Sequence, residues 1–234
     1  MSEIALWNSY MSGYDFLTKV DSYQTQLRDV ASALGNVRGK TVLDAGSGTG
    51  NLSIFLQDLG ATVMGCDASE TALEVHRKKS PKAKIFKASL EEPLPLNAET
   101  FDGVCCISVL FALSSQGCML ALNEFYRLLK SEGVLIVSIP SAERRNGQLF
   151  RLHFRSQVER HGWLGGALCA VGHLPAMLRT LYYSWRISSL PDWGGFHRFE
   201  ISELQAMIEI TGFKDLRISK TYGGASVLIT AKKS

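Results

Sequence analysis

Between residues 40 and 140, short runs of β-branched and other apolar residues alternate with longer segments whose apolar positions recur at helical spacing. The short runs predict strands at 41–45, 62–66, 84–87, 103–108 and 134–138. The amphipathic segments between them predict helices, among them 51–59, 69–79 and 119–130. Strands that alternate with helices in this way predict a parallel sheet, and each right-handed crossover packs its helix against that sheet.

The pattern changes after residue 140. A connection at 141–199 interrupts the alternation, and such a long connection within a compact α/β domain is typical of a lid or a substrate-recognition insertion with helices of its own. A last helix at 202–211 and strand-like runs at 214–220 and 226–231 then predict a closing hairpin. The organisation that we expect is a single domain, an N-terminal helical cap and a lid, at 1–234, 1–36 and 141–199 respectively.

Composition narrows the function. Of the 234 residues, 46% are hydrophobic and 20% are charged, which fits one globular domain, and the net charge of +3 is too small to indicate a nucleic-acid partner. The five cysteines include no C-x-x-C pair, so we expect neither a disulfide framework nor a metal site. The N-terminus lacks the pattern of a secretory signal, and the longest uncharged run, 163–178, is too short and too interrupted to span a bilayer. These features predict a cytoplasmic protein.

The positive charge is concentrated in the 141–199 connection. It holds eight arginines, three acidic residues and no lysine, so its net charge is +5 and that of the remaining chain is −2. Arginine without lysine suits bidentate capture of a carboxylate or phosphate on a substrate. A basic amphipathic stretch also suits a lipid-binding lid or a membrane surface. A solvated helix that carries scattered arginines explains the same pattern, and the three interpretations stay open.

A glycine-rich loop follows the first predicted strand, with Gly46, Gly48 and Gly50 directly before a helical segment. Glycine lets the backbone turn sharply and lets a ligand approach N–H groups at a helix N-terminus. Asp67 ends the next strand, where a carboxylate can accept both hydroxyl groups of a ribose. Loop and acid together predict a nucleoside-bearing ligand. A dinucleotide-binding G-x-G-x-x-G loop would need glycine where Asn51 stands, so hydride transfer is disfavoured.

The segment Asp44-x-Gly-x-Gly-x-Gly50, followed by Asp67, resembles motifs I and II of class I S-adenosylmethionine-dependent methyltransferases. Residues 95–102 resemble the family's segment before the fourth strand. Residues 124–133 resemble its E-x-x-R-x-L-K-P-G-G turn, with Ser-Glu in place of Pro-Gly. The resemblance covers residues 5–140 and 196–232 and leaves the insertion unmatched.

The resemblance implies a fold, a cofactor and a set of cofactor-binding residues. The fold is Rossmann-like α/β, a seven-stranded and mainly parallel sheet with helices on both faces and an antiparallel last strand; the length of the connection adds the expectation of a helical lid insertion. The cofactor is S-adenosylmethionine. The 46–50 backbone would hold its methionine part, Asp44 the ammonium group and Asp67 the ribose hydroxyls. The remaining residues implied to contact the methionine part, the adenine or the ammonium are Gly46, Ser47, Gly48, Gly50, Ala68, Ser69, Ser89, Leu90, Ile107 and Ser108.

Two residues are candidates for catalysis. Methyl transfer is an in-line displacement, so the protein mainly aligns the acceptor and excludes water, and a base helps where the acceptor carries a proton. His197 precedes the last predicted helix, in a stretch that resembles a histidine element of quinone-type methyltransferases, and is the candidate base or acceptor-orienting group; a histidine that caps the following helix is the alternative. Tyr14 lies in a segment that folds over the cofactor in relatives, against the alternative of plain aromatic packing.

The sequence therefore predicts methyl transfer from S-adenosylmethionine to an O or N atom of a small or lipid-like acceptor. No nucleic-acid partner is expected, and a peripheral membrane contact through 141–199 remains one interpretation of the insertion. Two alternatives stay open: an aminopropyl transferase-like enzyme, which would share the glycine loop, and a cofactor-binding module without catalysis. The sequence does not reveal the oligomeric state.

Overall fold

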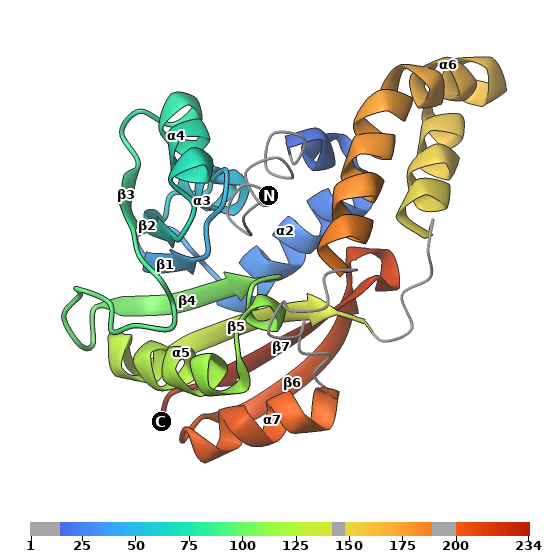
Figure 1. Cartoon of the computed structure of the whole chain (residues 1–234). Helices are drawn as coiled ribbons and strands as arrows, with labels where there is room; N and C mark the ends of the chain where they lie inside the picture. The colour runs from blue at the N-terminus through green and yellow to red at the C-terminus, as the bar shows by residue number, and fades with distance from the viewer. Residues whose placement is uncertain (1–14, 142–147, 189–199) are drawn as a thin grey trace.

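The computed structural model describes residues 15–141, 148–188 and 200–234. Its strands form one seven-stranded sheet in the order β3-β2-β1-β4-β5-β7-β6 (Figure 1). Strand β7 is antiparallel to both of its neighbours, and the other pairs are parallel. The expected sheet is thus confirmed. Its strands are β1 Thr41–Ala45, β2 Thr62–Asp67, β3 Lys84–Lys87, β4 Phe101–Ile107, β5 Leu129–Pro140, β6 Lys214–Thr221 and β7 Ser226–Lys232.

Helices cover both faces of the sheet (Figure 1). On one face lie α2 (Asp21–Leu34), α3 (Asn51–Asp58) and α4 (Glu70–Lys79), and on the other lie α5 (Ser115–Leu128) and α7 (Ile201–Ile210). Short 3-10 helices occur at η1 (Asp15–Lys19), η2 (Leu110–Ala112) and η3 (Tyr222–Gly224).

Helix α5 starts four residues earlier than the sequence predicts. The cause is an N-cap, because the Ser114 hydroxyl accepts a hydrogen bond from the Gly117 N–H at 2.9 Å. Strand β5 also begins before the predicted residue 134.

Two apolar clusters fill the space between the sheet and its helices, one on each side. Because successive strand residues point to opposite faces, Val42 packs into the cluster with α2 and α3, whereas Leu43 packs into the cluster with α5 and α7. Cys105 and Cys106 divide in the same way, and both are fully buried. These cysteines are small core residues, as the strand pattern predicts.

Polar residues of the family-like motifs fasten this framework. Arg127 donates to the Leu96 carbonyl at 2.9 Å, and Glu124 accepts from the Leu94 N–H at 2.9 Å, so the pair holds the loop before β4. Asp102 accepts from the Thr41 N–H at 2.7 Å and thereby fixes the start of β1. The motif residues far from the glycine loop are therefore structural.

The long connection contains α6 (Gln148–Ser188), which breaks at Gly162, where φ is 68° and ψ is 175°. Its two arms lie side by side, since His153 Nε2 is 3.1 Å from His173 Nδ1 (Figure 1). Gln148 Nε2 donates to the Gly223 carbonyl at 3.0 Å and ties the start of α6 to η3. In the described ranges, no helix is both long enough and apolar enough to cross a membrane. The lid interpretation stays a prediction.

The described part of the N-terminal region packs against the sheet. Tyr23, on α2, is 5% exposed, and its ring lies edge to face with Tyr222 of η3 at 5.9 Å between centroids. This is the plain packing role that an aromatic residue on a terminal helix is expected to have. The predicted cap at 1–36 extends beyond the described residues and stays a prediction.

Candidate cofactor and acceptor site

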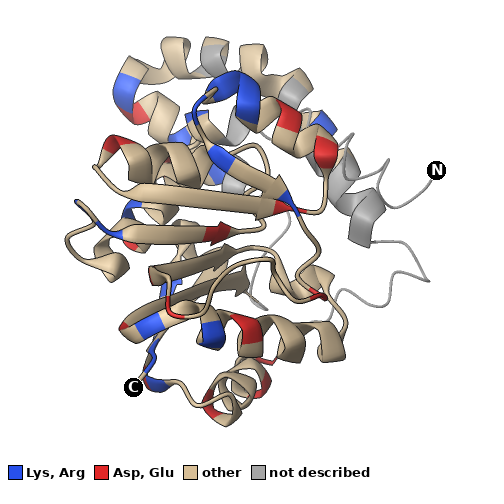
Figure 2. Ribbon diagram, turned by 90° about the vertical axis from the view of Figure 1, so that its left-hand side faces the viewer, with Lys and Arg blue, Asp and Glu red and all other residues tan. Residues whose placement is uncertain are grey.

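The residues predicted to bind the cofactor meet at one edge of the sheet. In register, Asp44 of β1 pairs with Gly65 of β2 and with Cys105 of β4, so the carboxyl ends of these three strands are adjacent. Figure 2 shows acidic positions near the arrowheads of two neighbouring strands at this edge. The Ala88 N–H donates to the Asp67 carbonyl at 3.1 Å, which brings the residues just after β3 to the same edge.

The glycine loop is folded onto the end of β2. The N–H groups of Gly46 and Ser47 both donate to the Cys66 carbonyl at 2.8 Å. Gly46, Gly48 and Gly50 have φ values of 79°, 52° and 82°, in the left-handed region that favours glycine. A Cβ on Gly46 would lie 2.4 Å from Val109 Cγ2, and one on Gly50 would lie 2.2 Å from the His76 ring. Both conformation and space therefore require glycine here.

Asp67 is held by two backbone N–H groups. Its Oδ2 accepts from Gly48 and its Oδ1 from Ser69, each at 2.8 Å. Burial raises the pKa of Asp67, and the two N–H bonds partly offset that rise. A carboxylate offers about four lone-pair positions, so Asp67 retains acceptor capacity for the hydroxyl groups of a ligand.

Asp44 lies deeper, with only 3% of its surface exposed. Its Oδ2 accepts from the Ser53 hydroxyl at 2.6 Å. Burial raises the pKa of Asp44 to about 6, against the effect of the Ser53 bond and with a further contribution from the Asp67 charge. A buried carboxylate of raised pKa favours a cation beside it, because the cation stabilises the ionised form. Asp44 therefore suits an ammonium group.

The end of β4 is fixed by a chain of polar contacts that reaches α2. Ser108 has a left-handed φ of 59°, and its N–H donates to the Ser138 carbonyl at 2.9 Å. The Ser108 and Ser138 hydroxyl oxygens are 3.3 Å apart, and Gln26 Nε2 donates to the Ser138 hydroxyl at 3.1 Å. Gln26 and Ser138 are both almost fully buried. The turn that places Ile107 and Ser108 is thereby set by contacts remote in sequence.

Sequence reasoning missed His76, the fully buried ring that lies under Gly50. Within the described part of the chain, both ring nitrogens are without a hydrogen-bond partner. Burial, and then the charges of Lys79 and Arg77, lower the pKa of His76 to about 4, so the ring is neutral at neutral pH. No spacing or motif signals this contact, because it joins α4 to the glycine loop, which follows β1. The same holds for Ser53 and Gln26.

Asp15 was also missed, although its neighbour Tyr14 was singled out. Asp15 Oδ1 accepts from the Thr49 hydroxyl at 2.7 Å and from Lys79 Nζ at 2.9 Å. This carboxylate connects the N-terminal region to the glycine loop and to α4. The adjacent Tyr-Asp sequence was the available signal.

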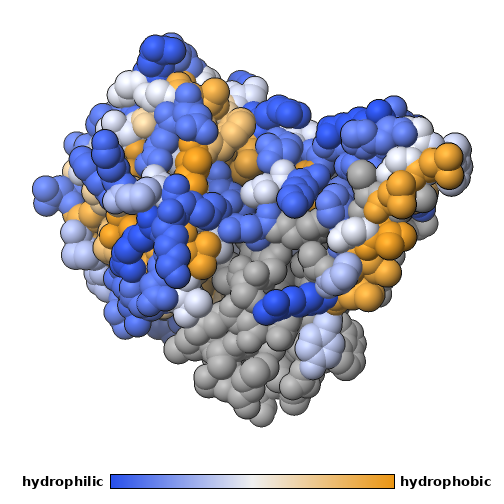
Figure 3. Space-filling view, turned by 90° about the horizontal axis from the view of Figure 1, so that it is seen from above, coloured by the Kyte–Doolittle hydropathy of each residue, from blue (hydrophilic) through white to orange (hydrophobic). Residues whose placement is uncertain are grey.

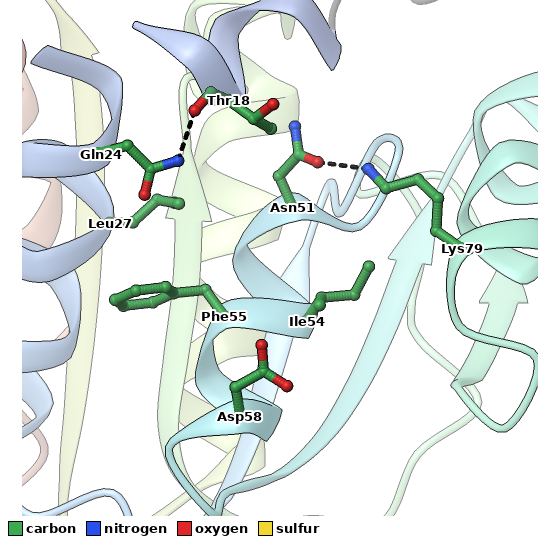
Figure 4. A pocket seen from close by; sticks show the side chains of 8 residues that line it. All are labelled: Thr18, Gln24, Leu27, Asn51, Ile54, Phe55, Asp58 and Lys79. Carbon is green, nitrogen blue, oxygen red and sulfur yellow. Dashed lines mark hydrogen bonds between the residues drawn. The ribbon is translucent and has the colours of Figure 1, made fainter. Parts of the chain in front are cut away.

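A pocket of about 250 Å³ lies next to this edge, between η1, α2, α3 and α4 (Figure 4). Asn51 and Lys79 lie at one end of it and are hydrogen-bonded to each other. None of the predicted cofactor-binding residues lines the pocket, whose lining residues are Thr18, Gln24, Leu27, Asn51, Ile54, Phe55, Asp58 and Lys79. The pocket is therefore separate from the edge that carries Asp44 and Asp67.

Comparison with known proteins assigns this arrangement. Residues 43–137 match the family model of a methyltransferase domain. Over 229 residues the chain is 28% identical to a demethylmenaquinone methyltransferase of Tropheryma whipplei, covering 95% of this chain and 88% of that protein. The chain is a class I S-adenosylmethionine-dependent methyltransferase. The methyltransferase is also similar to a ubiquinone biosynthesis O-methyltransferase of Alkalilimnicola ehrlichii. This shorter match is 32% identical over 113 residues and covers 47% of this chain and 45% of that protein.

Solved structures share the fold. An S-adenosylmethionine-dependent methyltransferase of Thermotoga maritima superposes with a TM-score of 0.65 at 19% identity and covers 98% of this chain and 99% of its own. The magnesium protoporphyrin IX methyltransferase of Synechocystis, with S-adenosylhomocysteine bound, gives a TM-score of 0.58 at 20% identity, covering 93% of this chain and 86% of its own.

The strand edge of the methyltransferase fits its cofactor. The glycine loop has the left-handed backbone that places its N–H groups at this edge, an acidic side chain with spare acceptor capacity stands at the neighbouring strand end, and Asp44 suits a cation. The two catalytic candidates, Tyr14 and His197, lie outside the described residues. Of the other predicted residues, Ala68 is exposed, Ser89 is half-buried and Leu90 is buried.

Proposed function

We propose that this methyltransferase acts on a small, lipid-like acceptor of the quinone class and, of the O and N atoms expected from the sequence, transfers the methyl group to an O atom, since a quinone carries no nitrogen. The observation that carries the proposal is the extent of the match to the demethylmenaquinone methyltransferase, which runs through 95% of the chain. It therefore includes the insertion, where acceptor recognition is expected. The match to the malonyl-[acyl-carrier protein] O-methyltransferase of Hamiltonella defensa covers only 44% of the chain.

The cofactor roles in the proposal follow the geometry of the strand edge. The backbone of the glycine loop holds the methionine part, and Asp44 and the carbonyl groups at Ile107 and Ser108 receive its ammonium. Asp67 accepts the ribose hydroxyls, while Ala68, Ser69, Ser89 and Leu90 flank the adenine. Support comes from the common edge of these residues and from the N–H groups that orient Asp67.

When bound, the cofactor supplies a methyl group on a positively charged sulfur, which already activates the carbon for displacement. The protein's own contribution is to hold that group in line with the acceptor atom and to exclude water. Ionised Asp44 contributes by fixing the ammonium end. The chain of contacts from Gln26 through Ser138 contributes by fixing the turn at Ser108.

His197 and Tyr14 retain their proposed roles as the acceptor-side base or orienting group and as part of the cover over the cofactor. For His197 the test is His197→Ala, which should lower kcat by about a hundredfold to ten-thousandfold with little change in S-adenosylhomocysteine affinity, since a general base contributes on that order. An unchanged kcat would leave His197 as a helix-capping residue.

The acceptor class is tested with the full chain, labelled S-adenosylmethionine and a demethylated prenyl quinol dispersed in detergent. We expect the label in the quinol, and mass spectrometry locates the methyl group on oxygen or ring carbon. Methylation of a ring carbon would overturn the choice of atom. No label in the quinol, together with transfer to a water-soluble amine or phenol, would overturn the acceptor class.

Membership of the methyltransferase family favours methyl transfer over the two alternatives, an aminopropyl transferase and a binding module without catalysis.

A further inference from the structure

The second arm of α6, residues 163–188, carries large apolar side chains that face solvent. Their exposed fractions are 85% for Leu164, 75% for Leu168, 68% for Val171, 55% for Leu178 and 53% for Tyr182. The spacings of four, seven, fourteen and eighteen residues from Leu164 place all five on one side of a helix. We call these five residues the outer stripe. Figure 3 shows apolar residues in a row along this outer side of α6.

The outer stripe differs from the other exposed apolar residues of the described chain. Leu59, Leu120 and Ile210, for example, lie apart from one another, just after α3, on α5 and on α7, and such isolated residues are common on soluble proteins. The stripe extends over about five helical turns, with Pro175 between Val171 and Leu178. From residue 161 to residue 178 the sequence contains no lysine, arginine, aspartate or glutamate. A helix face that meets only water normally carries such charges.

Charge indicates which partner fits the outer stripe. Over 148–188 the chain has five arginines, one glutamate, no lysine and no aspartate, a net charge of +4. One of the arginines, Arg179, is exposed directly beside Leu178. Basic residues next to an apolar helix face are typical of helices that lie in the headgroup region of an anionic bilayer. A second copy of the chain would instead bring two such basic surfaces together across a two-fold axis, which is unfavourable.

The ends of the outer stripe match an interfacial position. Tyr182 stands at one end, and Trp163, 74% exposed and edge to face with Phe154, precedes Leu164 at the other. Trp and Tyr favour the boundary between headgroups and acyl chains, because an apolar ring and a polar atom meet there in one side chain.

We propose that the second arm of α6 docks on the surface of an anionic phospholipid bilayer, with the outer stripe inserted among the headgroups. The start of α6 is bonded to η3, and the Ser141 N–H donates to the Ala225 carbonyl at 3.0 Å, so α6 is attached at the carboxyl end of β5. That end belongs to the edge that carries the cofactor site. Docking therefore brings the acceptor side of the site to the membrane. The functional reason for docking, access to an acceptor dissolved in the bilayer, rests on the proposed lipid-like acceptor.

Vesicle flotation of the full chain tests the docking. We expect the protein to float with vesicles of phosphatidylglycerol and phosphatidylcholine in equal parts, to float far less with phosphatidylcholine alone, and to be released by high salt. The double substitution Leu164→Glu with Leu168→Glu should lower the bound fraction by about tenfold or more, because it places two charges in the stripe. Ile210→Glu, a matched exposed position on α7, should bind as the natural protein does.

Unchanged S-adenosylhomocysteine affinity of the double variant shows that it is folded. The proposal is overturned if the natural protein stays with the aqueous fraction, or if the double variant floats as well as the Ile210→Glu control. It is also overturned if the double substitution converts a dimer to a monomer in light scattering and leaves flotation unchanged. Methyl transfer to the detergent-dispersed quinol without vesicle binding would reject docking alone. Vesicle binding without any transfer would reject the proposed acceptor alone.

Discussion

At the carboxyl edge of β1, β2 and β4, polar groups are buried and closely bonded, whereas along the second arm of α6 large apolar side chains face solvent. Asp44, 3% exposed, and Leu164, 85% exposed, mark the two extremes. The strand edge is specified by contacts that a single atom would disturb, as at Gly50 and His76. The outer side of α6 contributes little to the core. The comparison teaches that substitutions at the strand edge should disturb a closely bonded structure, whereas substitutions on the outer side of α6 should leave the fold intact.

Gly50→Ala should lower the free energy of unfolding and the cofactor affinity more than any other substitution considered, because a Cβ there collides with the His76 ring. The alanine pays about 1–2 kcal/mol for the left-handed backbone and about 1–3 kcal/mol more for the clash with His76. Chemical denaturation, together with S-adenosylhomocysteine titration, measures the loss. Gly39→Ala is the matched control, since Gly39 has a φ of 77° but no atom within 4 Å of its Cβ position.

Adding His76→Ala to Gly50→Ala sharpens the test. A double-mutant cycle should show a favourable coupling of about 1 kcal/mol or more, because the truncated ring no longer opposes the alanine. Additive losses would mean that the His76 contact does not restrain the loop.

The second-largest effect is expected in the pH dependence of cofactor binding. Because the pKa of Asp44 is about 6 in the free protein, S-adenosylhomocysteine affinity should fall about tenfold between pH 7 and pH 5, as binding then has to remove a proton. Isothermal titration at several pH values measures this. Asp44→Asn should bind weakly at every pH and lose the slope over that interval; a slope retained in Asp44→Asn would assign the titration to another group.

The raised pKa of Asp44 also predicts the direction in which folding stability changes with pH. Its pKa is raised in the folded state, from about 3.8 to about 6, so the folded protein binds this proton more tightly than the unfolded chain does. The contribution of Asp44 to folding stability is therefore fully present below the unfolded-state pKa of about 3.8 and is lost as the pH rises through the folded-state pKa of about 6. Asp44→Asn should remove this component from the pH–stability curve of the cofactor-free protein.

A smaller effect is expected at Glu132, which has a left-handed φ of 61° where the family-like turn carries glycine. Glu132→Gly should raise the free energy of unfolding by about 0.5–1 kcal/mol, since it relieves the backbone strain. Thermal unfolding measures the change. Ser131→Gly, at a neighbouring position without a positive φ, should instead lower stability, and a gain in both variants would contradict the strain argument.

The smallest effect is expected on α6. Leu168→Ser should leave both the free energy of unfolding and S-adenosylhomocysteine affinity within about 0.5 kcal/mol of the natural protein, because the side chain is 75% exposed. Denaturation and calorimetry of the same sample give both values. A loss as large as that of Gly50→Ala would erase the distinction between the two regions.

Local sequence signals were sufficient for the fold of the strand edge. The periodicity located all seven strands, and the short-range motif from Asp44 to Asp67 located the loop and its acid, because strand, turn and helix N-terminus follow one another within the chain. The buried contacts of His76, Ser53 and Gln26 were not predictable, since each joins residues that only the folded sheet brings together. The outer stripe of α6 was visible only as leucine-rich sequence, because exposure depends on which side of the helix packs against the first arm.

The most direct test of the cofactor assignment is calorimetric titration of the full chain with S-adenosylhomocysteine, comparing the natural protein with Asp67→Asn and with Asp58→Asn. Asp67→Asn should weaken binding by about tenfold to a hundredfold, in line with about 1.5–3 kcal/mol for hydrogen bonds to a charged group. Asp58→Asn, an exposed carboxylate on α3 away from the strand edge, should bind as the natural protein does. Equal affinity of all three proteins would contradict the placement of the cofactor at this edge.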